Sequence, residues 1–270
     1  MSRNFQMRSI PCRLAAIGLA GLIAAATPAT AQAAILLQDN FAGPTLATPG
    51  AVGNGFAVGS GAASASGGLA SVGGGGGADQ NIYSLDTFNP IGTTLTWQVS
   101  SRPSIGAAGV MIGWAQSGIG TCAGCGPEIW LEARNDRTVF DVVDSSGLFR
   151  YVANGPIGGT GPLTIDLTLT ATTWQFDVIG SGSISASGTF ASGFGIADVI
   201  SAAGGNLSAF ASVRSDCPAC GDIGTFSSVT AATSAPEPST LLLLAAGFAG
   251  IAASRRKPAD PGVVGVLSNR

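Results

Sequence analysis

Apolar and polar residues alternate strictly along much of the middle of this chain. Residues 163–170 read Leu-Thr-Ile-Asp-Leu-Thr-Leu-Thr, so the aliphatic side chains share one side and the polar ones share the other. Residues 174–178, Trp-Gln-Phe-Asp-Val, repeat the pattern after a link at residues 171–173. A period of two is typical of a β-strand with one face in the core and one in water. Two such runs joined by so short a link predict a β-hairpin.

Short runs of the same kind recur throughout the region between the two ends of the chain. They predict strands over residues 35–41, 81–85, 94–99, 108–115, 128–134, 138–144, 148–152, 182–190, 207–214 and 223–231. Gly, Ser, Asn and Pro separate them, and only residues 195–203 suggest one or two helical turns. The pattern predicts an all-β fold in which two antiparallel sheets pack as a sandwich. Residues 43–79 give a weaker signal, and the glycine run at 73–77 predicts a flexible loop.

The N-terminus has the order of a secretory signal. Arginines precede the apolar stretch 14–26, and Ala31-Gln32-Ala33 supplies small residues at the expected cleavage site. A positive region, an apolar region and an A-x-A site predict a signal peptide over residues 1–33. We therefore expect export through the Sec machinery and a single body domain over residues 34–234.

The C-terminus combines a rigid turn, an apolar run and a basic cluster. Pro236, Glu237 and Pro238 precede the uncharged stretch 240–253, and Arg255-Arg256-Lys257 follows it. The prolines fix φ and keep this segment extended. The apolar stretch is short for a bilayer, which usually takes about 20 residues, and the cluster Arg255, Arg256 and Lys257 would hold its cytoplasmic end. The pattern predicts a short transmembrane helix.

This tail resembles the PEP-CTERM sorting signal of exported proteins of Gram-negative bacteria. The resemblance covers residues 235–257, and residues 258–270 form a C-terminal extension beyond it. It implies that a membrane-embedded exosortase recognises Pro236, Glu237 and Pro238. It also implies anchoring in the inner membrane before processing, then display at the cell surface or in the extracellular matrix. Because exosortase systems often accompany exopolysaccharide production, extracellular polysaccharide is an expected partner.

The body resembles a concanavalin-like (laminin-G-like) jelly roll in the order of its parts. Asp39-Asn40-Phe41 opens it, the hairpin at residues 163–178 lies past its middle, and residues 224–230 close it. The resemblance implies that the closing strand pairs beside the first.

Charge narrows the classes of function. Residues 34–234 hold five basic and 13 acidic residues, a net charge of −8, and the chain has no histidine. An acidic body without lysine argues against binding nucleic acid. The lack of histidine excludes Ser-His-Asp and Cys-His catalysis and any histidine-ligated metal.

Two cysteine pairs occur in the body, Cys122 with Cys125 and Cys217 with Cys220. An even number of cysteines in an oxidising compartment predicts disulfides, and four cysteines allow three pairings. The alternative is a zinc site with all four as ligands, since the Cys-Pro-x-Cys-Gly turn has the shape of a zinc knuckle.

Glu128-Ile129-Trp130-Leu131-Glu132 is the one constellation that suggests enzymatic chemistry. On a strand, Glu128, Trp130 and Glu132 share a face. Concanavalin-like glycoside hydrolases carry an E-x-D-x-E strand, but here Trp130 replaces the central acid. We expect an exposed face with two solvated glutamates. A sugar site is the alternative, with Trp130 stacked on a pyranose ring and the glutamates accepting hydroxyl protons; an active hydrolase is the remaining one.

A calcium site is a further alternative. Asp136, Asp141 and Asp144 lie near Arg134 and Arg137, and oxygen ligands suit calcium. Ion pairs at strand ends explain the same residues. Taken together, the sequence predicts an exported, non-enzymatic, structural or adhesive protein; a carbohydrate-binding module and a degenerate glycoside hydrolase are the alternatives.

Overall fold

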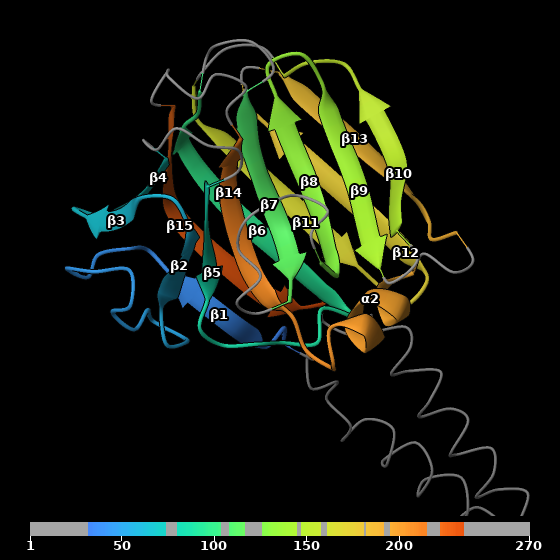
Figure 1. The fold of residues 1–270 in the computed structure, drawn as a ribbon, viewed down its shortest axis with the longest axis horizontal. Coiled ribbons are helices and arrows are strands. Elements are labelled where there is room, and N and C mark those ends of the chain that lie inside the picture. The colour runs from blue at the N-terminus through green and yellow to red at the C-terminus, as the bar shows by residue number, and fades with distance from the viewer. Residues whose placement is uncertain are drawn as a thin grey trace, which may run out of the picture. The chain divides into compact units, whose positions relative to one another are not determined.

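Two antiparallel sheets face each other in the computed structural model of the chain (Figure 1). The structure describes residues 32–73, 80–103, 108–116, 126–144, 147–157, 161–180, 182–191, 195–214 and 222–234. Ala33–Ser234 forms one compact unit. The four body cysteines, the sorting motif and the predicted transmembrane stretch lie outside the described residues, and the domain boundaries at either end stay predictions. Within the described residues, no helix has the length and apolar character needed to cross a membrane.

The first sheet, sheet A, contains the central hairpin. Its strands in spatial order are β13 (Ser183–Thr189), β12 (Thr173–Ile179), β11 (Leu163–Leu169), β6 (Thr93–Ser101), β15 (Ile223–Thr233), β4 (Leu69–Gly73) and β3 (Ala63–Ser66), and β1 (Ile35–Asp39) also pairs with β15. β11 and β12 form the predicted hairpin. The closing strand β15 pairs with the opening strand β1, as the jelly-roll resemblance implied.

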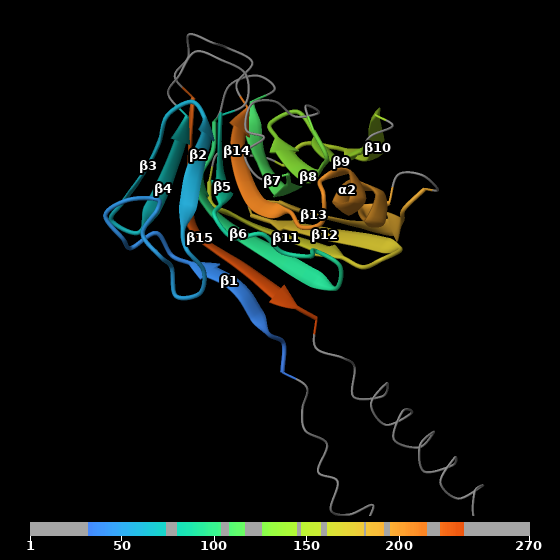
Figure 2. The same ribbon diagram turned by 60° about the horizontal axis from the view of Figure 1, so that its bottom comes forward.

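The second sheet, sheet B, contains the strand with the two glutamates. Its order is β10 (Gly147–Asn154), β9 (Thr138–Asp144), β8 (Glu128–Arg134), β7 (Gly109–Ala115), β14 (Ser208–Arg214), β5 (Gln80–Ser84) and β2 (Phe56–Ser60). The helix α2 (Ile196–Ala202) occupies the segment where one or two helical turns were predicted, and it contacts β8 and β9. In this strand order, β8 lies near the middle of its sheet, between β7 and β9 (Figures 1 and 2).

The main core lies between the two sheets, and the alternation of the sequence builds it. In β11 the four apolar side chains are buried while the threonines and Asp166 are half-buried on the other face. Aromatic rings fill the middle: Trp97 lies 5.7 Å from Phe56 and 5.3 Å from Phe226, measured between ring centroids. Each such side chain contributes roughly 1.5–3 kcal/mol on burial.

The outer face of sheet A is held by pairs of polar side chains. Thr94 and Thr168 lie 2.8 Å apart at their hydroxyls, and the hydroxyl of Thr164 donates to Gln98 at 2.9 Å. Cross-strand pairs of this kind contribute roughly 0.2–1 kcal/mol each. The period-two pattern thus sets both faces of the sheet.

The sequence reading missed three strands. β2, β3 and β4 all lie within residues 43–79, where the hydrophobic signal was weak. β3 reads Ala-Ser-Ala-Ser, so its residues differ little in hydropathy. It forms because β4 pairs with it on one side and with β15 on the other.

Candidate binding site on the outer face of sheet B

β8 presents its two sides to different surroundings, as the alternation predicted. Ile129, Leu131 and Ala133 belong to the main core, whereas Trp130 belongs to a second apolar cluster. The prediction of an exposed, solvated face is wrong. Glu128 is 6% exposed, Trp130 3% and Glu132 2%. Alternation reveals that two faces differ, but it does not reveal whether the second face is covered.

The second cluster shows that sheet B is packed on both sides. It consists of Met111, Ala115, Trp130, Val143 and Phe210, with Tyr83 packed against it. These residues come from β5, β7, β8, β9 and β14, and they alternate along their strands with residues of the main core. We call the surface that they share the outer face of sheet B.

Strand register places aromatic residues in one row across this face. Tyr83 pairs with Phe210, Phe210 with Gly113, Gly113 with Trp130, and Trp130 with Asp141. Gly113 has no side chain, so the row has a gap, that is, a position without a side chain, between Phe210 and Trp130. A Cβ atom at residue 113 would collide with the carbonyl oxygen of Ile129. The gap is therefore required by the close approach of β7 and β8.

The neighbouring row is polar. Asn81 pairs with Ser212, Ser212 with Met111, and Met111 with Glu132. An amide, a hydroxyl and a carboxylate therefore lie in register across four strands. In sequence these residues are far apart, and only the fold brings them together.

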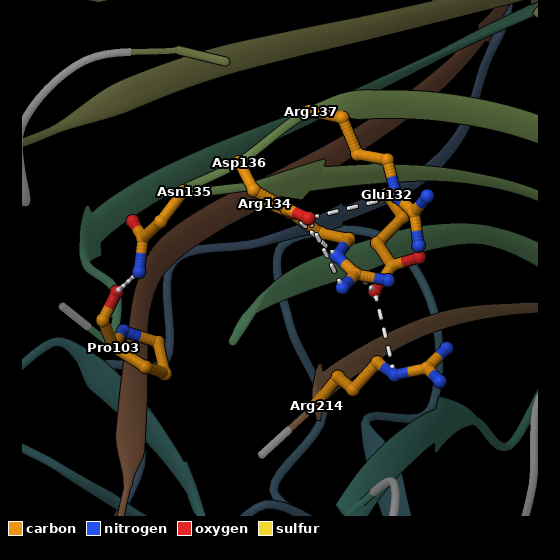
Figure 3. Close-up of polar contacts among 7 residues, drawn as sticks. All are labelled: Pro103, Glu132, Arg134, Asn135, Asp136, Arg137 and Arg214. Carbon is orange, nitrogen blue, oxygen red and sulfur yellow. Dashed lines mark hydrogen bonds and ion pairs between the residues drawn. The ribbon is translucent and has the colours of Figure 1, made fainter. Parts of the chain in front are cut away.

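Charged side chains continue from Glu132 toward one end of β8 (Figure 3). The Oε1 atom of Glu132 lies 3.8 Å from Nε of Arg214 and 3.9 Å from Nε of Arg134. Arg134 in turn donates to both carboxylate oxygens of Asp136, at 2.9 and 3.4 Å. Arg137 lies 3.8 Å from the same carboxylate. Three of the five basic residues of the body thus gather around two acids.

Among the described residues, buried polar atoms on this face without a hydrogen-bond partner include Nε1 of Trp130, Oδ1 of Asn81, and Oγ of Ser208 and of Ser212. A buried polar group without a partner costs about 1–3 kcal/mol. The indole nitrogens of Trp97, Trp114 and Trp174 are equally buried without a partner, so the indole of Trp130 alone distinguishes nothing. What distinguishes this face is that a donor and several acceptors without partners occur on it together. A polar ligand or water that reached them would complete these bonds.

Sequence reasoning named only part of this site. It identified Glu128, Trp130 and Glu132 but missed Asn81, Ser208, Ser212 and the gap at Gly113. On β14, Ser208, Phe210 and Ser212 alternate with the core residues Ala209, Ala211 and Val213, and that alternation was the available signal. It did not reveal that these serines face the same side of the sheet as Trp130.

The predicted calcium ligands do not converge in the part of the chain that the structure describes. Asp136 contacts Arg134 and Arg137, and Asp141 is buried in the aromatic row. The side chain of Asp144 lies outside the described residues. Within those residues, no group of three or more metal-ligating side chains occurs. The disulfide and zinc alternatives concern Cys122, Cys125, Cys217 and Cys220, and both stay predictions.

Comparison with known proteins identifies the tail and the fold. Residues 234–257 match the PEP-CTERM protein-sorting motif. None of the curated proteins compared with the chain matches it. Among solved structures, the chain is similar to arcelin-5, a lectin-like defense protein of Phaseolus vulgaris, with 13% identity and a TM-score of 0.50 over 67% of this chain and 93% of that chain. Peanut lectin gives 10% identity and a TM-score of 0.52 over 76% of this chain and 98% of that chain. The CBM2 module of the evolved Dit protein of Lactobacillus casei BL23 phage J-1 gives 12% identity and a TM-score of 0.51 over 76% of this chain and 98% of that chain.

The chain therefore combines a PEP-CTERM sorting motif with a lectin-like, concanavalin-like β-sandwich, and both predicted resemblances are confirmed. At these identities the structural likeness shows the fold alone. The motif implies an exported, exosortase-processed protein of the cell surface.

Proposed function

We propose that this protein is a non-catalytic adhesive component of the cell surface or extracellular matrix, which binds extracellular polysaccharide through the outer face of sheet B. The observation that carries the proposal is the group of unpartnered polar atoms on Asn81, Trp130, Ser208 and Ser212. Sugar hydroxyls both donate and accept, so different hydroxyls of one oligosaccharide that extends from β5 to β8 can satisfy the amide oxygen and the indole N–H. The aromatic row beside these atoms suits the apolar faces of sugar rings.

The arrangement of the glutamates supports binding rather than hydrolysis. A retaining glycosidase needs two carboxyl groups about 5–5.5 Å apart, one of which donates a proton. Here Trp130 stands between Glu128 and Glu132 on the shared face. Glu132 also lies against the guanidinium groups of Arg134 and Arg214, which is the setting of a structural ion pair. We therefore propose that the protein is not an enzyme.

A purely structural role is the second candidate, and the burial of the face favours it. With Trp130 only 3% exposed, the face is filled by the protein's own atoms, so a sugar must enter by displacing what covers it. The two candidates differ in one measurable respect. Only the adhesive role requires affinity for polysaccharide.

The test is retention of the exported protein in electrophoresis gels that contain extracellular polysaccharide from the producing bacterium. Trp130→Phe removes the indole N–H but keeps an aromatic ring, and Ser212→Ala removes a neighbouring hydroxyl. Loss of one hydrogen bond of about 1 kcal/mol weakens binding roughly fivefold. The matched control is Trp114→Phe, because Trp114 is buried with an unpartnered Nε1 in the main core, on the opposite side of the same sheet.

We expect reduced retention for both site variants and unchanged retention for the control. Absence of retention in the parent protein would instead favour the purely structural role. Equal retention of the parent and the Trp130→Phe and Ser212→Ala variants would exclude this face as the binding site.

A further inference from the structure

We propose that the exported protein forms a symmetric dimer through β13, in which this strand pairs antiparallel with β13 of a second copy and joins the two A sheets. β13 forms one end of sheet A (Figure 2). β12 pairs with it on one side, and no other described strand pairs with it. This inference concerns the edge of sheet A and is independent of the sugar-binding proposal for sheet B.

Within the part of the chain that the structure describes, the backbone of β13 has hydrogen-bonding groups without a partner along its outer edge. Just beyond its ends, Gly180 N–H donates to Gly182 C=O at 2.9 Å and Phe190 N–H donates to Thr172 C=O at 3.0 Å. In an antiparallel pair, hydrogen-bonded positions alternate with non-bonded ones. The even-numbered residues 182–190 therefore face β12. Ser183, Ser185, Ser187 and Thr189 direct their N–H and C=O groups away from it.

The side chains of β13 do nothing to block another strand. Its sequence, Ser-Ile-Ser-Ala-Ser-Gly-Thr, contains no charge and no proline, and its register with β12 is unbroken over all seven residues. Proteins usually protect exposed edges with lysine, proline or a bulge. The other described edges are irregular or short: β10, β2 and β1 each have a register shift, and β3 has four residues. β13 thus stands out among the described edges as long, regular and uncharged.

The occupant that we infer is a second copy, because the strand is complementary to itself. Antiparallel pairing centred on Ala186 places Ser185 opposite Ser187 and Ser183 opposite Thr189, which are the positions with free backbone groups. It also places Ile184 opposite Gly188, so a large side chain meets a residue without one. Gly188 cannot be larger, because a Cβ atom there would lie 2.7 Å from the ring of Trp174. No like charges face each other across this axis.

Pairing also removes apolar surface from water. Ile184 and Ala186 are only half-buried, and they pack against the main core from the edge of the sheet. A contact of one strand pair is small, and interfaces of small area form weak complexes. Tethering at a cell surface compensates, because it raises the effective concentration of neighbouring copies.

The experiment is sedimentation of the exported protein over a concentration series. We expect a monomer–dimer equilibrium in the parent and at least tenfold weaker association in Ser185→Lys, which opposes like charges near the axis. Ser64→Lys is the matched control, because Ser64 is exposed on β3, the opposite edge of the same sheet. A parent that stays monomeric overturns the proposal. Dimers that survive Ser185→Lys, or that are lost in Ser64→Lys, place the contact elsewhere and also overturn it.

A cysteine at the axis gives a second, position-specific readout. Opposed residues at a non-hydrogen-bonded position lie with their Cα atoms about 4.5 Å apart, a separation that a disulfide spans. Ala186→Cys should yield a covalent dimer that reducing agent dissolves, beyond any background in the parent. Ala65→Cys on β3 should not. Absence of this dimer in a folded Ala186→Cys protein contradicts pairing centred on Ala186.

Discussion

Glu132 and Arg214 approach each other from two different strands of sheet B, with Oε1 of the glutamate 3.8 Å from Nε of the arginine. Only β7 separates the two strands. Because Glu132 is 2% exposed, water solvates its carboxylate little. The contacts with Arg214 and Arg134 therefore stabilise this buried carboxylate. We expect Glu132→Gln to lower the free energy of unfolding by roughly 1–3 kcal/mol, since it leaves buried groups without their ionic partner.

Denaturant unfolding measures this loss, and Asp136→Asn is the matched control. The side chain of Asp136 is 46% exposed, so its ion pairs lie in a surface setting and contribute less than about 1 kcal/mol. Equal stabilities of the parent and Glu132→Gln would show that the carboxylate is solvated after all.

Gly113 is expected to tolerate no side chain. Gly113→Ala forces the new Cβ against the Ile129 carbonyl oxygen, and overpacking of this kind costs typically about 1–3 kcal/mol. The same substitution places a methyl group beside Trp130 and should therefore also reduce polysaccharide retention. Gly155→Ala is the control, because a Cβ there has open space around it; its melting temperature should match the parent. A Gly113→Ala protein as stable as the parent would contradict the close approach of β7 and β8.

Asp39 should give the stability a specific pH dependence. Burial raises the pKa of Asp39 above its ordinary value of 3.8, although hydrogen bonds from the Phe41 and Asn40 N–H groups act in the opposite direction. The folded state then holds this proton to higher pH than the unfolded state does. The contribution of Asp39 to stability therefore falls as pH rises from about 3.8 through the folded pKa.

Asp39→Asn should remove this contribution to the dependence of the free energy of unfolding on pH. At neutral pH the variant should be as stable as the parent or more stable. The asparagine oxygen can still accept the 2.7 Å hydrogen bond from the Phe41 N–H, which holds Phe41 at its positive φ of 52°. Unfolding curves from pH 4 to 7 check this, and identical slopes in both proteins would refute the role of Asp39.

The sorting motif makes a prediction about processing. Glu237→Ala, or deletion of residues 240–257, should leave the protein unprocessed or mislocalised, because exosortase loses its recognition site or its membrane segment. Mass spectrometry of the C-terminus checks this, with Asp260→Ala as a control outside the matched residues 234–257. An intact Arg270 on the surface-exposed parent would rule out cleavage.

Thiol titration decides between the two interpretations of the cysteines. We expect no free thiols at Cys122, Cys125, Cys217 and Cys220 in the exported protein, and a lower melting temperature after reduction. Stoichiometric zinc, with four thiols that titrate after chelation, would establish the metal site instead.

Strands could be predicted from the sequence where neighbouring residues differ strongly in hydropathy. β8 and β9 were predicted with the bounds that the structure shows, because apolar and polar residues alternate along β8 and valines and Phe140 enrich β9. β3 was missed because alanine and serine differ too little. In the site, the parity of Glu128, Trp130 and Glu132 was predictable because it is local. Their burial, and the pairing of Asn81 with Ser212, depend on contacts between distant segments.

The position of β15 has a consequence for the order of events in time. This last strand of the body lies inside sheet A, paired with β6 along one side and with β4 and β1 along the other. A chain exported from its N-terminus delivers β15 after all the other strands, so the middle of the sheet stays open until then. The matched motif begins at residue 234, directly after Thr233. If the chain is exported as the motif implies, we therefore expect closure of the body and arrival of the sorting motif to be nearly simultaneous, so that exosortase would meet a substrate that has only just completed its folding.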